Sequence, residues 1–447
     1  MASRVGLWRQ SLLAVVRNPW RLALTAAAAA AVAGGLLTFV VAPLQDRFPG
    51  NLFDFHAYLA GARAAAHHAS VYAAFERAQQ NPQFAGFDYP PLIAWLLQPL
   101  TWMPERAAAV LWVWAMLACT VIAAIVLGRA LLPETWPRLE IAALAAFVFT
   151  PATFNLGLGQ LEPLVLLLLT LALVAYLRGD RLTCGVLIGI AASLKLAPIV
   201  LVLVLVKRRW WRASFAAVAT VLASALAGAM ALGLPALTEY ATRVLPLLAR
   251  QDGWLYNQSI GGVINRAADH SVLGFQPALL WISITTVCMA VAAVGATVVV
   301  TRAGARPRSE RAMEFACGVL ALLIAGSITW YLHLLLLLIP FFAAAAYLAR
   351  RGIARERSLA VAGCLCVLGV GVAGAVLSDA VFVNFLIAHH GSRWWWPLLQ
   401  LASLPAASVV AFFVVAVRTL TSARAPSPSG YMPRAMTIRA SLAGDSH

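Results

Sequence analysis

The chain has 447 residues, of which 62% are hydrophobic and 11% are charged, and it carries a formal net charge of +16. Because soluble domains typically contain about 25% charged residues, this composition excludes a soluble globular protein and indicates a polytopic membrane protein. The basic residues lie in short clusters between apolar runs, as in the cytoplasmic loops of membrane proteins. We therefore attribute the positive charge to membrane topology and contact with anionic lipid, and we expect no binding to nucleic acid.

Apolar runs of spanning length recur along the whole chain, since a transmembrane helix needs about 20 mostly apolar residues. The first run, 22–44, is too long for a signal peptide and is expected to be an anchoring helix. Arginines before it predict that residues 1–21 are cytoplasmic. The Pro- and Ser-rich tail 419–447 is expected to be cytoplasmic and disordered. The further expected spans are 107–131, 140–155, 160–178, 213–234, 276–300, 312–327, 330–349, 358–378 and 397–418.

Basic residues flank the apolar segment 182–206 on both sides, with Arg178 and Arg181 before it and a cluster that begins at Lys207 after it. A single kinked span would leave one of these clusters outside. Two short helices that meet near Lys195 would keep both inside, with arms of about 12 residues and about 18 Å. We favour this re-entrant hairpin and keep the single span as the alternative. With it, residues 22–418 form one all-α domain of about 12 membrane-embedded helices.

Three outer regions are longer than a connection requires, at 45–106, 235–275 and 379–396. The first of them suggests a built site, and Asp54 lies there at the start of an amphipathic stretch, 55–66. Aspartate is a preferred helix N-cap, so its position is explained either by capping or by a role as a catalytic carboxylate.

The same loop contains the motif Phe87-Asp88-Tyr89-Pro90-Pro91-Leu92, which leads into a short apolar helix at 91–103. Proline is well tolerated at the first helical position. The helix is short for a span and is expected to lie at the outer membrane interface. Tyr89 and Trp95 then have the positions of membrane-surface anchors.

Lys195 is one of two lysines in the chain and lies within an apolar segment. An ionisable residue inside the membrane is costly, and it is by default a candidate functional site. Its ammonium could contact a lipid-linked phosphate. It could also form an internal ion pair with Glu162 or Asp54.

Other polar residues of the outer segments suit a carbohydrate or phosphate ligand. Asn155, Gln160 and Glu162 lie in one outer turn, where turn-forming and capping roles explain the asparagine and the glycines equally well. His333 lies near Trp330 at the outer end of a span, where a structural role is the alternative. The 235–275 loop combines aromatic rings, amides and a cation in Trp254, Tyr256, Asn257, Gln258 and Arg266. No His, Cys or carboxylate spacing indicates a metal site, and no glycine-rich phosphate loop is evident, so we expect neither a metal nor a cofactor.

Taken together, these segments resemble glycosyltransferase family 87, whose members have the GT-C fold and use polyprenyl-phosphate-linked sugars. The resemblance covers about residues 20–345. It rests on Asp54, the Phe87–Leu92 motif, Gly159-Gln160, the run from Ser193 to Pro198, Asn257-Gln258-Ser259 with Arg266, and Trp330 with His333.

The resemblance implies an inverting hexosyltransferase with Asp54 as the general base. Lys195, Arg266 and His333 would contact the donor phosphate, and Gln160, Asn257, Gln258, Tyr89 and Trp330 would bind substrate. The expected partners are a polyprenyl-phosphate sugar donor, a glycolipid or glycan acceptor, and membrane lipid. The expected location is the bacterial inner membrane, with the active site on the periplasmic face.

Mannose is the expected sugar, and an arabinofuranosyltransferase is the alternative within the family. A lipid or sugar transporter is the alternative from another class. It predicts polar residues at the midplane of several helices and some repeat symmetry, whereas the polar groups concentrate near the outer face and no internal repeat is visible between the two halves. A structural subunit without activity would leave the large outer loops and Lys195 unexplained.

Overall fold

The computed structural model describes residues 18–75, 86–249, 253–269, 280–378 and 395–423. Over these residues the chain is helical and contains no strand, only an isolated bridge between Asn257 and Trp330. Seven of the described helices are long and apolar enough to cross a membrane, or eight if one bent pair is a single span. The chain is therefore a polytopic α-helical membrane protein. The count of about 12 embedded helices includes shorter ones and stays a prediction.

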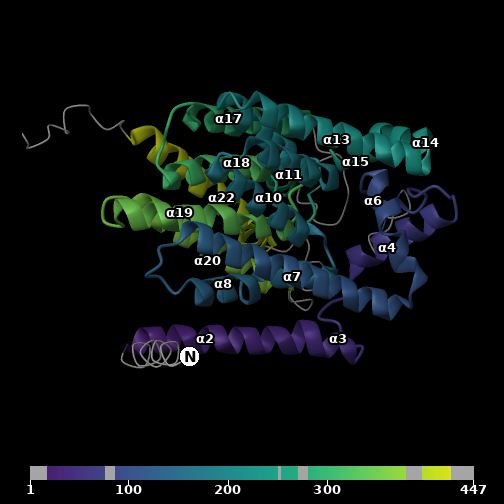
Figure 1. Ribbon diagram of the computed structural model, residues 1–447, viewed down its shortest axis with the longest axis horizontal. Coiled ribbons are helices and arrows are strands. Elements are labelled where there is room, and N and C mark those ends of the chain that lie inside the picture. The colour runs from purple at the N-terminus through teal and green to yellow at the C-terminus, as the bar shows by residue number, and fades with distance from the viewer. Residues whose placement is uncertain (1–17, 76–85, 250–252, 270–279, 379–394, 424–447) are drawn as a thin grey trace, which may run out of the picture.

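The long helices run along the long axis of the molecule (Figure 1). The candidate spans are α2 to α3 (Pro19–Leu44, through the π-turn η1, Leu37–Val41), α7 (Glu105–Leu131), α13 (Trp211–Leu232), α17 (Leu280–Val300), η5 (Tyr331–Leu337) with α19 (Leu338–Arg351), α20 (Arg357–Ser378) and α22 (Trp395–Ser422). The bent pair is α8 (Arg138–Phe147) with α9 (Thr150–Leu158), and α10 (Glu162–Arg178) and α18 (Arg308–Ala325) complete the bundle.

The outward faces of the peripheral helices are apolar, as contact with lipid requires. On α13, Phe215, Leu222 and Met230 are 76%, 64% and 79% exposed. Soluble monomers rarely expose such contiguous apolar surface. Most of the outer region 379–396 and the tail beyond 423 lie outside the described residues.

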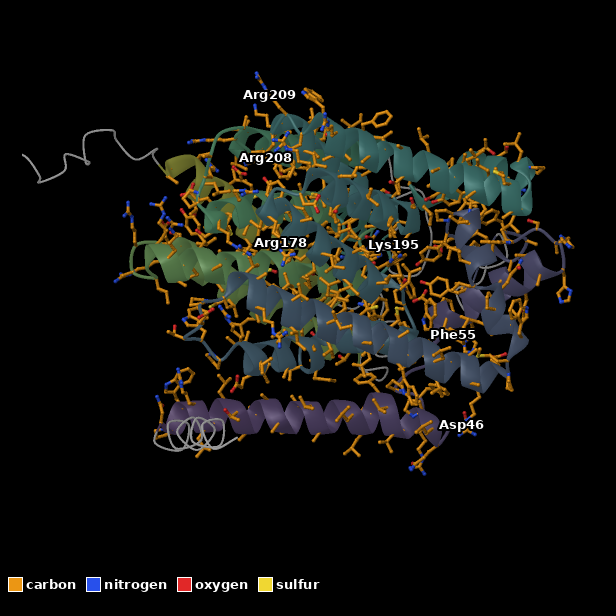
Figure 2. All side chains as sticks on the ribbon, in the orientation of Figure 1. Asp46, Phe55, Arg178, Lys195, Arg208 and Arg209 are labelled. Carbon is orange, nitrogen blue, oxygen red and sulfur yellow. The ribbon has the colours of Figure 1, made fainter. Side chains whose placement is uncertain are left out.

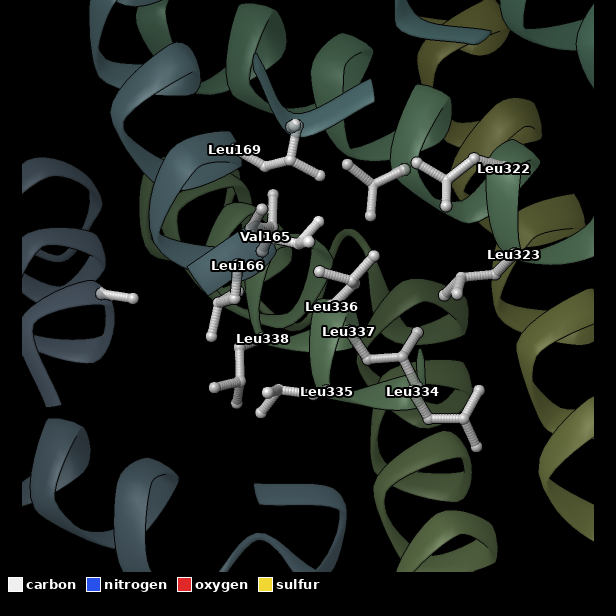
Figure 3. Close-up of a cluster of buried hydrophobic side chains, with 14 of the residues drawn as sticks. Val165, Leu166, Leu169, Leu322, Leu323, Leu334, Leu335, Leu336, Leu337 and Leu338 are labelled. Carbon is white, nitrogen blue, oxygen red and sulfur yellow. The ribbon is translucent and has the colours of Figure 1, made fainter. Parts of the chain in front are cut away.

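The centre of the bundle is packed with leucine (Figure 3). Val165 and Leu169 of α10 face Leu322 of α18 and the run Leu334–Leu338, and all of them are buried. Lipid tails are as apolar as leucine, so close packing, rather than removal from water, holds these helices together.

Segment 182–206 folds back on itself. Helix α11 (Arg181–Leu194) ends just before Lys195, and η3 (Ala197–Val200) and α12 (Leu201–Lys207) return. The guanidinium carbon of Arg181 lies 5.5 Å from the centroid of the Trp210 ring, so the start of one arm lies beside the end of the other. Figure 2 shows Arg178 and Arg208 toward one end of the molecule and Lys195 nearer the other. A single span would instead separate Arg181 from Trp210 by its full length.

Small residues bring the first arm of the hairpin against α13. A Cβ at Gly185 would collide with the Ala213 carbonyl oxygen, and one at Gly189 would lie 2.6 Å from the Ala217 carbonyl oxygen. Glycines four residues apart therefore allow the two backbones to touch, as in other membrane helix pairs. This contact fixes the depth of α11 and hence the position of Lys195 at its end.

A buried ionic cluster holds the second arm at the opposite end of the bundle. Glu314 of α18 is fully buried and lies 2.7 Å from Arg208 and 2.9 Å from Arg306, and it accepts a hydrogen bond from the Tyr176 hydroxyl at 3.0 Å. A buried carboxylate is tolerated because it is paired and hydrogen-bonded. The hairpin is thus fixed to α10 and α18 at its base.

Candidate active site

The described part of the 45–106 loop lies beyond one end of the bundle, where α4 (Phe53–Ala66) and α6 (Pro91–Leu96) gather near α14 (Leu234–Glu239) (Figure 1). The turn η2 (Gln98–Trp102) packs against α4. The chain continues from α14 through η4 (Tyr240–Val244) and α15 (Leu245–Leu248) to α16 (Ile260–Asp269). The short apolar helix expected at 91–103 is present as α6 and η2. Trp95 is 45% exposed, which fits its expected place at an interface.

Lys195 lies at the centre of a polar cluster that three distant segments form. Its ammonium nitrogen is 2.6 Å from Glu162 Oε2 and 3.1 Å from His333 Nε2. It also lies 5.8 Å from the centroid of the Tyr89 ring. The ion pair with Glu162, one of the alternatives considered for Lys195, is therefore present.

The contact between Lys195 and His333 defines the state of the imidazole. An ammonium group can only donate hydrogen bonds, so Nε2 of His333 accepts, and its ring proton is assigned to Nδ1. The Lys195 and His333 side chains are 14% and 19% exposed, whereas Glu162 is 2% exposed. Glu162 is therefore the covered member of the cluster, and Lys195 and His333 are the members that a ligand can approach.

Asp54 lies in the first turn of α4 but does not cap it. The N-cap is Leu52, with φ of 50° and no side-chain cap, and Asn51 Oδ1 accepts the Phe53 N–H at 3.2 Å. The capping explanation of Asp54 is therefore wrong, and its half-buried carboxylate is available for other contacts.

The surroundings of Asp54 favour its protonated form more than water does. Burial, with a smaller contribution from the negative charge of Asp88, raises the pKa of Asp54 from 3.8 to about 7, although the positive charge of Lys195 and a hydrogen bond from Gln160 act in the opposite direction. Burial also raises the pKa of Asp88 to about 6, against the effect of Lys195. A base is most effective when its pKa lies near the working pH.

Gln160 links Asp54 to two tyrosines. Its Oε1 accepts the Tyr89 hydroxyl at 2.9 Å and is also in contact with the Tyr58 hydroxyl, and the two hydroxyls lie 3.0 Å apart. Burial, followed by negative charges nearby, raises the pKa of both hydroxyls far above 10, so they remain donors. Tyr89, expected to be an anchor at the membrane surface, is a member of this network.

The sequence interpretation did not assign functional roles to Asp88 or Tyr58. Tyr58 is four residues after Asp54 and so shares its helix face, and Asp88 directly precedes Tyr89 in the proline motif.

Four of the residues expected to bind donor or substrate form a second group: Asn257, Gln258, Arg266 and Trp330. Asn257 and Trp330 form an isolated antiparallel β-bridge. Gln258 Nε2 donates to the Ala402 carbonyl at 2.9 Å, and Arg266 donates to the Trp254 and Asn257 carbonyls at 2.8 and 2.7 Å. Asn257, Gln258 and Arg266 are almost fully buried, and Trp330 is half-buried. The Asn257 bridge holds the 254–259 loop to the segment that carries His333, Gln258 holds it to α22, and Arg266 holds it to α16. Substrate binding by these four residues stays a prediction.

The described part of the chain is thus a polytopic helical membrane protein with a cluster of carboxylates, tyrosines, lysine and histidine near one end of its bundle. Comparison with known proteins identifies its relatives. The chain belongs to glycosyltransferase family 87, whose sequence model matches residues 87–326. The matched range contains Asp88, Gln160, Glu162 and Lys195, whereas Asp54 and His333 lie outside it.

Three characterised relatives are similar over part of the chain. Two are named polyprenol-phosphate-mannose-dependent alpha-(1-2)-phosphatidylinositol pentamannoside mannosyltransferases. The one from Mycobacterium tuberculosis is 29% identical over 54% of this chain and 56% of the relative, and the one from Mycolicibacterium smegmatis is 31% identical over 53% and 58%. The match thus spans little more than half the length of these two proteins. A further M. tuberculosis relative, a phosphatidylinositol mannoside mannosyltransferase with the same donor dependence, is 28% identical over 77% of this chain and 79% of its own length.

Proposed function

We propose that this protein is an inverting membrane glycosyltransferase that transfers mannose from a polyprenyl-phosphate donor to a hydroxyl of a mannosylated glycolipid. Membership of glycosyltransferase family 87 and the activities for which the relatives are named support the reaction class. The observation that carries the proposal is the convergence of Asp54, Lys195 and His333 from three separate segments onto one polar cluster. An arabinofuranosyl donor is the alternative within the same site.

In the proposed reaction, Asp54 removes the proton from the acceptor hydroxyl as its oxygen attacks the anomeric carbon. The bond between that carbon and the phosphate oxygen breaks, and the polyprenyl phosphate leaves with the electron pair. A single displacement inverts the anomeric configuration, and it needs one base and no carboxylate nucleophile. The leaving phosphate needs neutralisation of its charge more than it needs an acid. Lys195 supplies the positive charge, and the neutral His333 ring can donate a hydrogen bond from Nδ1.

We infer that the cluster faces the outer side of the membrane. The basic residues around Arg178 and Arg208 lie toward the opposite end of the molecule, and positive loops are cytoplasmic. The 182–206 hairpin is then re-entrant. At its break Pro198 is buried, whereas Leu196 is 47% exposed, so protein covers the non-helical backbone only in part. A polyprenyl chain is held in the bilayer by about 0.8 kcal/mol per CH₂, so the enzyme brings its site to the lipid. Helices α4 and α6 cover the site and reduce hydrolysis of the donor.

Transfer by the purified full chain in lipid vesicles tests this proposal. Polyprenyl-phosphate mannose and polyprenyl-phosphate arabinofuranose are the donors, and phosphatidylinositol mannosides are the acceptors. We expect transfer of mannose and its loss in Asp54→Asn with donor binding retained. The matched control is Asp46→Asn, which changes an exposed aspartate of the same loop; Asp46 has a φ of 64°, which asparagine also adopts. Undiminished transfer by Asp54→Asn would remove Asp54 from the mechanism, and movement of donor across the vesicle membrane without transfer would favour the transporter alternative.

A further inference from the structure

Gln160 is a buried amide, 3% exposed, between the end of α9 and the start of α10. Three donors converge on its Oε1, namely the Leu161 N–H at 3.0 Å, the Tyr89 hydroxyl at 2.9 Å and the Tyr58 hydroxyl. With the oxygen so occupied, the Gln160 side-chain nitrogen faces Asp54. Gln160 makes a side-chain hydrogen bond to the Asp54 carboxylate.

The orientation of this amide follows from the backbone. The Leu161 N–H can only donate a hydrogen bond, and it lies 3.0 Å from the atom assigned as oxygen. A flipped amide would oppose this N–H with its own NH₂ group, two donors facing each other. The hydrogen-bond network therefore assigns the oxygen and leaves the NH₂ group for Asp54.

Backbone contacts keep Gln160 and Asp54 at a fixed separation. Gly159 ends α9 with φ of 69°, and a Cβ there would lie 2.6 Å from the Cβ of Phe55, the neighbour of Asp54. The Gly159 carbonyl accepts the Trp112 indole N–H at 2.6 Å, and the Gly157 carbonyl accepts the Leu52 N–H at 3.1 Å. The end of α9 thus fixes the beginning of α4.

We propose that Gln160 is a positioning residue for Asp54, whose amide N–H holds one carboxylate oxygen and leaves the other for the acceptor hydroxyl. This inference rests on the proposed role of Asp54 as the base, and it differs from direct binding of substrate by Gln160. An amide suits the task because it donates a hydrogen bond without giving up a proton. It therefore holds Asp54 before and after proton transfer, while the tyrosines and Leu161 hold the amide.

The protonation of Asp54 offers a direct test, measured as the infrared carboxyl band that Asp54→Asn removes. The charged and titratable groups near Asp54 are Asp88 and Lys195, with Tyr58 and Tyr89 beyond the amide, and Glu162 and His333 bound to Lys195. Gln160→Glu is nearly isosteric and sets a second carboxylate beside Asp54, and it should raise the midpoint of the band by about one pH unit or more. Gln160→Leu removes a hydrogen-bond donor to the Asp54 carboxylate, so it should also raise the pH midpoint of the Asp54 band.

Transfer kinetics of the full chain in vesicles, with polyprenyl-phosphate mannose as donor, complete the test. We expect kcat to fall about 10²-fold in Gln160→Leu because the base is misplaced, with the donor KM within about twofold of the parent value. Thr297→Val is the folding control, because it removes a buried hydroxyl that bonds only within the α17–α18 pair, to the Ala293 and Cys317 carbonyls.

An Asp54 midpoint that is unchanged in both Gln160 variants would overturn the inference. So would a raised donor KM with unchanged kcat, which is the result that direct donor binding predicts. If the midpoint shifts while Asp54→Asn still transfers sugar, the contact between Gln160 and Asp54 stands and the proposed base is what fails. Gln160→Glu keeps the test decisive if Gln160→Leu does not fold.

Discussion

Variants of the ion pair between Lys195 and Glu162 should show whether Lys195 acts in sugar transfer or only stabilises the fold. The two charged atoms are 2.6 Å apart, and the Glu162 side chain is 2% exposed. Lys195→Met leaves this carboxylate buried without its cation, and breaking a buried pair in this way costs about 3–5 kcal/mol. We expect the lower end of that range, because Lys195 is 14% exposed and Glu162 can take up a proton.

The double variant Lys195→Met/Glu162→Gln removes both charges and should recover most of the lost stability, since replacing a whole buried pair is often close to neutral. Thermal unfolding of the detergent-solubilised chain measures this. We expect Tm to fall by roughly 5 °C in the single variant and to return most of the way in the double one. Transfer should fall about 10²–10³-fold in both, because the cation that neutralises the phosphate is absent from each. A double variant that is even less stable than Lys195→Met would refute the argument about the ion pair. A double variant that recovers transfer together with stability would refute the role of Lys195 at the phosphate.

Three further predictions follow from the same geometry. Gly159→Ala should lower Tm and transfer together, because it costs about 1–2 kcal/mol in backbone conformation and its Cβ also clashes with Phe55. Gly179→Ala, at φ of 82° with nothing within 4 Å of its Cβ, carries the same backbone cost without the clash and should lower Tm less and leave transfer unchanged. Because the pKa of Asp54 is raised to about 7 and a base acts when deprotonated, kcat/KM should rise with pH through about 7, and a rate that falls with pH over that range would contradict the role. Arg266→Met should lower Tm by leaving the Trp254 and Asn257 carbonyls without their donor, and a rise in the donor dissociation constant at unchanged Tm would instead support the predicted contact with donor phosphate.

The distribution of polar groups bears on the transporter alternative. Over the described residues, the clusters around Lys195 and around Glu314 lie at different ends of the helices. The leucine layer of α10, α18, η5 and the start of α19 lies in the bundle between them. A transporter site is expected near the midplane, at broken helices that belong to repeated halves. The glycosyltransferase proposal needs only the one cluster, around Lys195, beside the 45–106 loop.

The sequence by itself determined the membrane class and most of the spans. The bilayer demands about 20 apolar residues per helix, which is a local property that can be read from composition alone. The chain reversal near Lys195 could also be predicted from the sequence. The basic residues on both sides of 182–206 are expected on the same side of the membrane, which requires the segment to turn back. Residue type and the resemblance to glycosyltransferase family 87 made Asp54, Lys195, Gln160 and His333 candidate site residues, and their roles stay predictions.

Only the tertiary structure decided which of these residues meet. Lys195 pairs with Glu162, 33 residues away, and contacts His333, 138 residues away. These contacts depend on helix packing, such as the contact of the α11 glycines with α13. No local sequence pattern predicts that packing. The structure also decided that Leu52, rather than Asp54, begins α4, and that Arg266 and Gln258 contact backbone carbonyls. A buried polar side chain must find a partner, but the identity of that partner depends on how the whole bundle closes.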